Sequence, residues 1–533
     1  MEEEYDDVPK ELIHLIQSFL PPKDAARTCV LSKSWLHAWS TVNTLRFAKC
    51  GHLTLQEQID YINCIDHTLL RYLNQNLSID CFHLHLHIHN LSFLPYPLDN
   101  WFQALTAFSY STLKELSLTM CGVKVYTLDR GWLTLPDAIF SFQNLDILSL
   151  RADNIHTICQ VRVNACPVIK CSFLRVLELI GVCITEEALH NLFSSCSLLE
   201  KINLDFGPSV RLKMIKVTNL RCLCELKIVL VKNDLLEMYD LPSLHLFSYC
   251  SVTSYAVRMD TLESVRELVL LRLTVDDAFS DMIKTNFPFL ETLTLSIEDC
   301  MLETINITCV SLKRLTLSVY LDKQLNIQVY ASKLLYFSYN AWKMATLLFP
   351  SGTPAHIHLI LRFLKNDPID LSFFFKVRKA LDLSSNFHIE TIDDFVPSNI
   401  NLDDLRRMVP FPARNVQQLS FGKHWAKKLW KHSPLLDFLF SICYPRYVKA
   451  YYRSSNSKNY LYKQMVGIMY KKMCNLKDIE IKNPHDGKWE SLRHSWRSYP
   501  HDGKWESLAY SWRSFHDEGN NFNSDEFKLN WVS

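Results

Sequence analysis

Apolar residues follow two different spacings along the chain, and each spacing predicts a different kind of structure. Near the N-terminus Leu12, Leu15, Ile16 and Phe19 lie three or four positions apart, which is the period of an α-helix. From about residue 110 the dominant pattern is LxxLxL, in which alternate residues point to the same side of a strand. The pattern predicts a short helical module followed by a long series of strands.

The LxxLxL pattern recurs at a spacing typical of leucine-rich repeats. It starts at residues 113, 145, 174, 199, 223, 244, 265, 290, 312 and 334. Most intervals fall within the roughly 20–29 residues of such repeats. Each LxL is expected to form a strand that stacks in parallel on the next repeat. We therefore predict an α/β protein: a three-helix module followed by a leucine-rich-repeat solenoid, with a parallel β-sheet horseshoe and a helical or irregular convex side.

Three short helices are predicted within the first fifty residues. The first is expected to start near residues 6–9 (DDVP), where a carboxylate can cap free N–H groups and proline loses no useful donor. The prolines at 21–22 should end it, and a second helix should follow. Ser32 can cap a third helix that carries Trp35 and Trp39 on adjacent turns. So small a module has little core of its own, which favours a partner.

Residues 8–21 (VPKELIHLIQSFLP) and 23–35 (KDAARTCVLSKSW) resemble the two halves of a plant-type F-box. The match covers about forty positions with little need for gaps. Members of that family dock this element on a Skp-type adaptor, which bridges to a cullin and a RING subunit. The resemblance implies that adaptor contacts or the F-box core are formed by Val8, Pro9, Leu12, Ile16, Leu20, Pro21, Val30, Leu31, Ser32, Trp35 and Trp39.

The module departs from the F-box pattern at two positions. Val8 stands where leucine is usual, and Ser34 stands where arginine is common. The missing charge should weaken docking without abolishing it, because apolar anchors carry most of the energy of an interface. The alternative is that the helices only cap the solenoid and bind no adaptor.

Composition and charge exclude several functional classes. A net charge of +1 gives no electrostatic argument for nucleic-acid binding. Only 11 glycines are present, and no phosphate-binding glycine motif occurs. The acidic N-terminus is unlike a signal peptide, and no apolar run reaches the roughly 20 residues of a membrane span. We expect an intracellular protein, in the nucleus and/or cytoplasm, that contacts neither membrane nor nucleic acid.

No metal or cofactor site is predicted. The 17 cysteines form no zinc-type pattern of paired CxxC motifs and are expected to be reduced thiols. Four histidines, at 83, 85, 87 and 89, alternate with apolar residues on a predicted strand. We interpret them as a solvated strand face, with metal binding by neighbouring pairs as the alternative. This strand is expected to start the sheet that the repeats extend.

The chain divides into five predicted segments: the F-box at 1–48, a linker with the first solenoid strand at 49–109, leucine-rich repeats at 110–345, degenerate repeats with a closing region at 346–482, and an irregular tail at 483–533. Within the fourth segment, strands are predicted at 380–383 and 416–421. The tail holds a tandem duplication, 484–499 and 500–515. We interpret it as a duplication in a loosely ordered tail, and alternatively as an interaction tail rich in Trp and Arg.

These observations favour a substrate-recognition subunit of an SCF-type (Skp-cullin-F-box) E3 ubiquitin ligase. The F-box would bind the adaptor and the repeats an unknown protein target. No spacing singles out a nucleophile, a base and an orienting group, so we expect no catalytic residues. The alternative is a non-catalytic leucine-rich-repeat binding protein with a degenerate F-box that recruits no ligase. The leucine pattern indicates where a binding surface lies and not what it binds.

Overall fold

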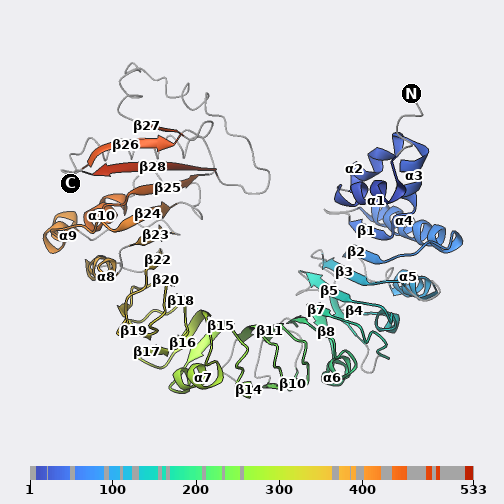
Figure 1. Cartoon of the computed structure of the whole chain (residues 1–533), viewed down its shortest axis with the longest axis horizontal. Coiled ribbons are helices and arrows are strands. Elements are labelled where there is room, and N and C mark those ends of the chain that lie inside the picture. Colours follow the sequence, from blue (N-terminus) through green and yellow to red (C-terminus); the bar gives the residue numbers. More distant parts are fainter. Residues whose placement is uncertain are drawn as a thin grey trace. The chain divides into compact units, whose positions relative to one another are not determined.

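The computed structural model divides into two units, Met1–Val265 and Arg266–Ser533, which we describe separately. The structure describes residues 8–20, 22–48, 54–88, 95–107, 112–122, 131–153, 159–163, 168–206, 212–230, 235–251, 257–362, 371–383, 386–391, 401–421, 435–452, 476–482, 488–491 and 523–531. All statements below concern these ranges (Figure 1).

The first unit opens with the predicted helical module: α1 (Lys10–Phe19), α2 (Pro22–Arg27), a 3₁₀ turn at Thr28–Val30 and α3 (Lys33–Ser40). The carboxylates predicted to cap the first helix, Asp6 and Asp7, lie outside the described residues. Pro9 occupies the N-cap position without a side-chain hydrogen bond, since its fixed extended backbone already directs the chain into the helix. Pro21 also lies outside the described residues.

The main sheet of the first unit is formed by the predicted repeat strands, all parallel. Its order follows the chain: β1 (Thr44–Ala48), β2 (Cys81–Ile88), β3 (Glu115–Gly122), β5 (Ile147–Asp153), β7 (Val176–Ile180), β9 (Lys201–Asp205), β11 (Glu225–Leu230) and β13 (Leu246–Ser251). The LxxLxL leucines stack in register, so that Leu116, Leu148, Leu177 and Ile202 form one fully buried row. Each buried leucine contributes about 1.5–3 kcal/mol, which explains why the pattern repeats.

The sheet starts one strand earlier than predicted, and the segment at 49–109 is more than a linker. The strand β1 pairs in parallel with β2, the histidine strand that we expected to come first. Between them lies α4 (Leu55–Asn74), and α5 (Pro95–Ala107) follows β2. Thr54 and Glu57 form a capping box on α4, each side chain bonding the other residue's backbone N–H. The Thr-x-x-Glu pattern at 54–57 is a sequence signal for the start of a helix, and it predicts α4, which the sequence analysis did not include.

The side of each repeat opposite the main strands includes short strands as well as the predicted helices (Figure 1). Helices α6 (Glu186–Ser195) and α7 (Ala278–Asn286) lie where the sequence suggested them. The short strands form three further parallel sheets, namely β4 (Gly131–Thr134) with β6 (Cys159–Arg162) and β8 (Val182–Cys183), β10 (Met214–Thr218) with β12 (Leu235–Tyr239) and β14 (Val257–Met259), and β17 (Thr304–Thr308) with β19 (Asn326–Tyr330) and β21 (Thr346–Leu348). The expected helical or irregular side is therefore partly sheet.

The second unit repeats the same architecture. Its parallel strands are, in order, β15 (Glu267–Val275), β16 (Thr292–Cys300), β18 (Arg314–Val319), β20 (Tyr336–Ala341), β22 (His356–Leu361), β23 (Phe387–Thr391), β24 (Val416–Phe421) and β25 (Tyr447–Tyr452). Helices α8 (Leu371–Leu381), α9 (Leu402–Met408) and α10 (Leu435–Ile442) lie between the later strands. The strand predicted at 416–421 is confirmed as β24.

The strand predicted at 380–383 was wrong, because Ala380 and Leu381 end helix α8. Phe373, Phe374 and Val377 precede them at helical spacing, and all five side chains are buried. Over the four residues 380–383, apolar and polar positions alternate as in a strand. Over residues 373–381, the apolar positions have the spacing of a helix.

The prediction of an irregular tail from residue 483 was also wrong in part. The strand β28 (Asn523–Trp531) runs antiparallel between β25 and β26 (Leu476–Lys482), and β27 (Trp489–Ser491) pairs with β26. Phe527 and Leu529 of β28 are buried. The last strand thereby covers the edge that β25 would otherwise expose. The duplication contributes β27 from its first copy, and its second copy lies outside the described residues.

Candidate protein-interaction surfaces

The N-terminal module has a small core that joins α1 to α3. Ile13, Trp35 and Ala38 are buried together, and Val8 packs against them. Of the residues that sequence analysis assigned to contacts or core, Trp35 and Val8 therefore belong to the core. Ser32 caps α3 as predicted, because its side-chain oxygen accepts a hydrogen bond from the Trp35 N–H at 3.4 Å.

Gln17 is a buried polar residue that sequence reasoning missed. Its Nε2 donates to Thr28 Oγ1 at 2.9 Å and to the Trp35 carbonyl at 3.1 Å. One side chain on α1 thus bonds both the 3₁₀ turn and α3, and it fixes their spacing. No local signal marks such a residue, since glutamine usually lies at the surface of a helix.

The module exposes most of its large apolar side chains. We call this set the apolar module surface: Leu12, Leu15, Ile16, Phe19, Val30, Leu31, Leu36 and Trp39. Phe19 is 79% exposed and Val30 is 87% exposed, whereas Ile13 beside Leu12 is fully buried. Exposed apolar side chains at this density mark a protein-interaction surface.

The apolar module surface contains five residues that sequence analysis assigned, namely Leu12, Ile16, Val30, Leu31 and Trp39. Of the others, Pro9 is the exposed N-cap of α1 and Leu20 is its partly buried C-cap. The resemblance did not assign Leu15, Phe19 or Leu36, although helical spacing places the first two on the same face as Leu12.

Replacing Trp35 by alanine should unfold the module while leaving the second unit intact. A buried tryptophan truncated to alanine costs about 3–5 kcal/mol, which is large for so small a core. Hydrogen exchange should show loss of amide protection in α1 and α3. Trp39→Ala is the matched control: that side chain is 37% exposed, so protection should persist. Equal protection in both variants would show that Trp35 is not a core residue.

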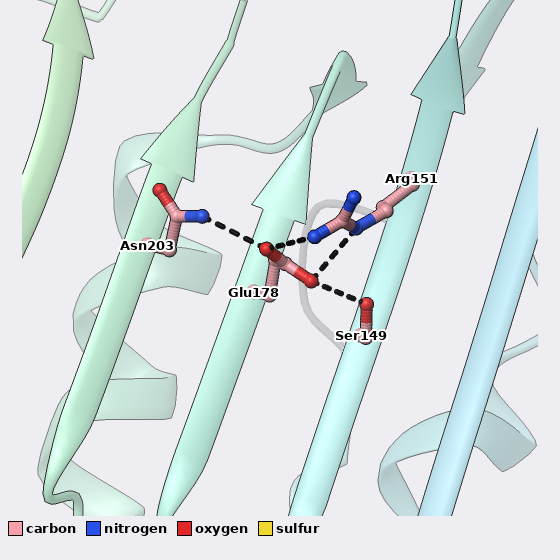
Figure 2. Close-up of polar contacts among 4 residues, drawn as sticks. All are labelled: Ser149, Arg151, Glu178 and Asn203. Carbon is pink, nitrogen blue, oxygen red and sulfur yellow. Dashed lines mark hydrogen bonds and ion pairs between the residues drawn. The ribbon is translucent and has the colours of Figure 1, made fainter. Parts of the chain in front are cut away.

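The second candidate surface is the side of the main sheet that faces away from the buried leucines. In the first unit, four polar residues on this side bond one another across neighbouring strands (Figure 2). Both oxygens of Glu178 on β7 are engaged: Arg151 donates at 2.6 and 2.8 Å, Ser149 at 2.7 Å and Asn203 at 2.8 Å. Ser149, Glu178 and Asn203 are register partners on β5, β7 and β9. This bonding fixes three strands and satisfies the carboxylate.

Burial alone would raise the pKa of Glu178, but the hydrogen bonds from Arg151, Ser149 and Asn203 outweigh it and hold the pKa below its ordinary value. A lowered pKa means that the folded state favours the charged form. The stabilisation is therefore complete above the ordinary carboxylate pKa of about 4.3 and is lost as the pH falls through the lowered value.

Glu178→Gln should accordingly reduce the stability of strands β5, β7 and β9 by about 2 kcal/mol at pH 7, and the difference should shrink as the pH falls below about 4. Hydrogen exchange of the β7 amides at several pH values measures this effect. Glu200→Gln is the control, since its exposed pair with Arg175 is worth at most about 1 kcal/mol. A difference that does not depend on pH would contradict the assignment.

The histidine strand β2 places His83 and His85 on the same side of the sheet. His83 Nε2 lies 3.3 Å from Glu115 Oε1, and His85 Nε2 lies 3.1 Å from Cys121 Sγ. The side chain of His87, and His89 altogether, lie outside the described residues. Among the described side chains, no three His, Cys, Asp or Glu are grouped closely enough to hold a metal ion. No helix in the described ranges has the length and apolarity of a membrane span.

Family comparisons match both parts of the chain. The F-box domain model matches residues 6–47, and the model described as "FBD-associated F-box protein At5g56370, LRR repeats" matches residues 98–244. The first match covers the helical module. The second covers a large part of the repeats in the first unit.

Similar proteins occur in Arabidopsis thaliana. F-box/FBD/LRR-repeat protein At1g13570 is 27% identical over 39% of this chain and 45% of its own length, and putative F-box/FBD/LRR-repeat protein At4g00315 is 29% identical over 37% and 41%. Putative FBD-associated F-box protein At1g05080 is 25% identical over 59% of this chain and 68% of its own length. The matches thus span less than half the length of the first two relatives.

Proposed function

Because this chain belongs to the plant family of F-box/leucine-rich-repeat proteins, we propose that it is a substrate-recognition subunit of an SCF-type ubiquitin ligase. In this role the helical module binds a Skp-type adaptor, which bridges to cullin and RING subunits. The repeat sheet binds a protein target. The nucleus or the cytoplasm, where ubiquitin ligases act, is the corresponding location.

The observation that carries the proposal is the apolar module surface. The module buries Ile13, Trp35 and Ala38 but leaves the apolar face of α1 and the end of the 3₁₀ turn uncovered. A module that served only as a cap on the repeats would turn these side chains inward. Large apolar residues that stay exposed beside an intact core provide the contacts by which a stable partner binds.

The chain supplies binding and orientation in this proposal, and other subunits supply catalysis. Holding a target beside a conjugating enzyme that carries ubiquitin raises the effective concentration of the target's lysines near that ubiquitin. The observed sheet suits this task, because its side chains are held by cross-strand bonds such as those of Glu178. Because these side chains are already ordered, binding loses less of their conformational entropy.

Co-expression of the full chain with a Skp-type adaptor tests the proposal. We expect a 1:1 complex on size-exclusion chromatography, and ubiquitin transfer to a captured target when cullin and RING subunits are added. An intact, folded chain that recovers no adaptor would overturn the proposal. That result would instead favour a repeat protein whose F-box recruits no ligase.

Ser34 provides a finer test of the same interface. It stands where related F-boxes commonly carry a basic residue, on the second position of α3. Ser34→Arg should strengthen adaptor binding by a few-fold, since a rim charge adds at most about 1 kcal/mol. Isothermal titration at low and high salt would detect the gain and its screening.

A further inference from the structure

The sheet surface of the second unit carries two arginines whose partners differ from those of the paired arginines in the first unit. In the first unit several basic side chains are paired, namely Arg151 with Glu178, Arg175 with Glu200 and Lys201 with Glu225. In the second unit, Arg314 and Arg362 contact aromatic rings instead. Among the described residues, no carboxylate lies within ion-pair distance of either guanidinium. Arg314 begins β18 and Arg362 directly follows β22, and the neighbouring strands also carry tyrosine and histidine side chains.

Arg314 belongs to one of two aromatic groups. Its guanidinium lies 5.4 Å from the centre of the Tyr336 ring, and the Tyr336 hydroxyl lies 3.3 Å from His358 Nδ1. His358 in turn contacts His388, with ring centres 6.2 Å apart. These residues occupy the polar positions at the beginnings of β18, β20, β22 and β23.

Arg362 belongs to the second group, at the other ends of the same strands. It lies 5.4 Å from the centre of the Tyr320 ring, and Tyr320 packs edge-on against Trp342 at 5.7 Å. The Arg362 Nε donates to Asn340 Oδ1 at 2.9 Å, which fixes the plane of the guanidinium. Within the part of the chain that the structure describes, its other side-chain N–H groups bond no acceptor, so they can bind one from a partner.

Few acidic side chains lie on or beside these strands, and each has a nearby side chain that it can bond. Glu390 lies 3.6 Å from His358, and Asp322 is paired with Lys343 in the loop beyond β18. Between the two aromatic groups lie the small polar side chains Thr316, Ser318 and Ser338, together with the apolar Ile360 of β22. The surface therefore combines two oriented guanidiniums with tyrosine and tryptophan, the residues enriched at the centres of protein interfaces.

We propose that this basic-aromatic surface, centred on Arg314 and Arg362, binds an acidic segment of the target protein. The inference rests on the proposed function and specifies its target-binding half. A carboxylate accepts two parallel hydrogen bonds from one guanidinium, and a guanidinium already stacked on a ring loses little freedom on binding. Asp and Glu side chains of an extended segment supply such acceptors. The chain carries no general basic excess, which sets this surface apart from a nucleic-acid groove.

A labelled twelve-residue peptide of alternating Glu and Ala serves as the probe for fluorescence anisotropy with the full chain. Alternating Gln and Ala is the neutral control, and a twelve-nucleotide RNA tests the other anionic class. We expect the Glu peptide to bind at least tenfold more tightly than the Gln peptide. The variant Arg314→Gln with Arg362→Gln should lose at least tenfold in affinity for the Glu peptide.

Arg175→Gln is the matched control, because that arginine is exposed but already paired with Glu200. The affinity of this variant for the Glu peptide should equal that of the wild type. Thermal unfolding of all variants checks folding. Equal binding of Glu and Gln peptides, tighter binding of RNA, or an equal loss in the Arg175 variant would overturn the proposal. Adaptor binding by the same preparations separates the two hypotheses: a chain that binds adaptor but not the Glu peptide refutes only the target surface.

Discussion

Replacing Leu12 and Ile16 together by aspartate should abolish adaptor binding and leave the chain folded. Both side chains lie on the exposed face of α1, 48% and 43% exposed, so charge at these positions enters no core. Each would place a carboxylate against the apolar surface of the adaptor, where an unpaired charge is expensive to bury. We expect a loss of at least 100-fold in affinity, measured by titration of purified adaptor.

Two control variants make this result specific. Leu335→Asp changes a leucine in the second unit that is somewhat more exposed, at 57%, and should not alter adaptor affinity. Ile13→Asp changes the fully buried neighbour of Leu12 and should unfold the module instead. If the Leu12 and Ile16 double variant kept wild-type affinity, the apolar module surface would not be the adaptor site. An equal loss in the Leu335 variant would point to non-specific aggregation.

Replacing Phe527 by aspartate should detach the C-terminal strand. Phe527 is fully buried on β28, opposite Val448 of β25 and Ile481 of β26. The substitution removes a large apolar side chain and buries a carboxylate, which together cost more than about 4 kcal/mol. Once β28 leaves, β25 keeps only β24 as a partner strand, and β26 keeps only β27. Hydrogen exchange should show loss of protection for the amides of β25 and β26 that bond β28, and the chain should aggregate through the exposed edges.

Lys528→Gln is the control for this prediction. Its side chain alternates to the other side of β28, where it donates to Glu480 at 2.8 Å, and glutamine keeps a donor there. Protection of β25 should then be unchanged. Wild-type protection in the Phe527 variant would mean that β28 does not hold the C-terminal end of the sheet.

The repeat strands could be predicted from the sequence because their signal is local and repeated. Each LxL fixes the inward side of its strand, and successive copies supply the partners. The C-terminal strand β28 lacked this help. Its partner β25 lies at Tyr447–Tyr452, far from Asn523–Trp531 in the sequence. Pairing between such distant segments depends on how well they pack in the folded protein and not on the local sequence pattern. The tail therefore resembled irregular structure.

The division of the N-terminal module into core and contact residues was equally beyond the sequence. Leu12 and Ile13 are adjacent and similar, yet the first is exposed and the second is buried. Helical periodicity correctly grouped Leu12 with Ile16, but it could not say whether that face packs inward. The position of α3 decides the matter, since Trp35 and Ala38 cover Ile13. The pairing of the arginines in the first unit likewise depends on register across strands.

The junction between the helical module and the first strand has a mechanical consequence. Helix α3 ends at Ser40 and β1 begins at Thr44, so only three residues separate them. The Tyr72 hydroxyl bonds the Val42 carbonyl at 2.7 Å, and Asn43 Nδ2 bonds Asp80 at 2.8 Å. The connection is thus clamped by α4 and by the approach to β2. Within the first unit these bonds hold the module at a fixed position relative to the first strands. In the proposed complex, the distance from a bound adaptor to those strands is therefore fixed and is not averaged over a flexible linker.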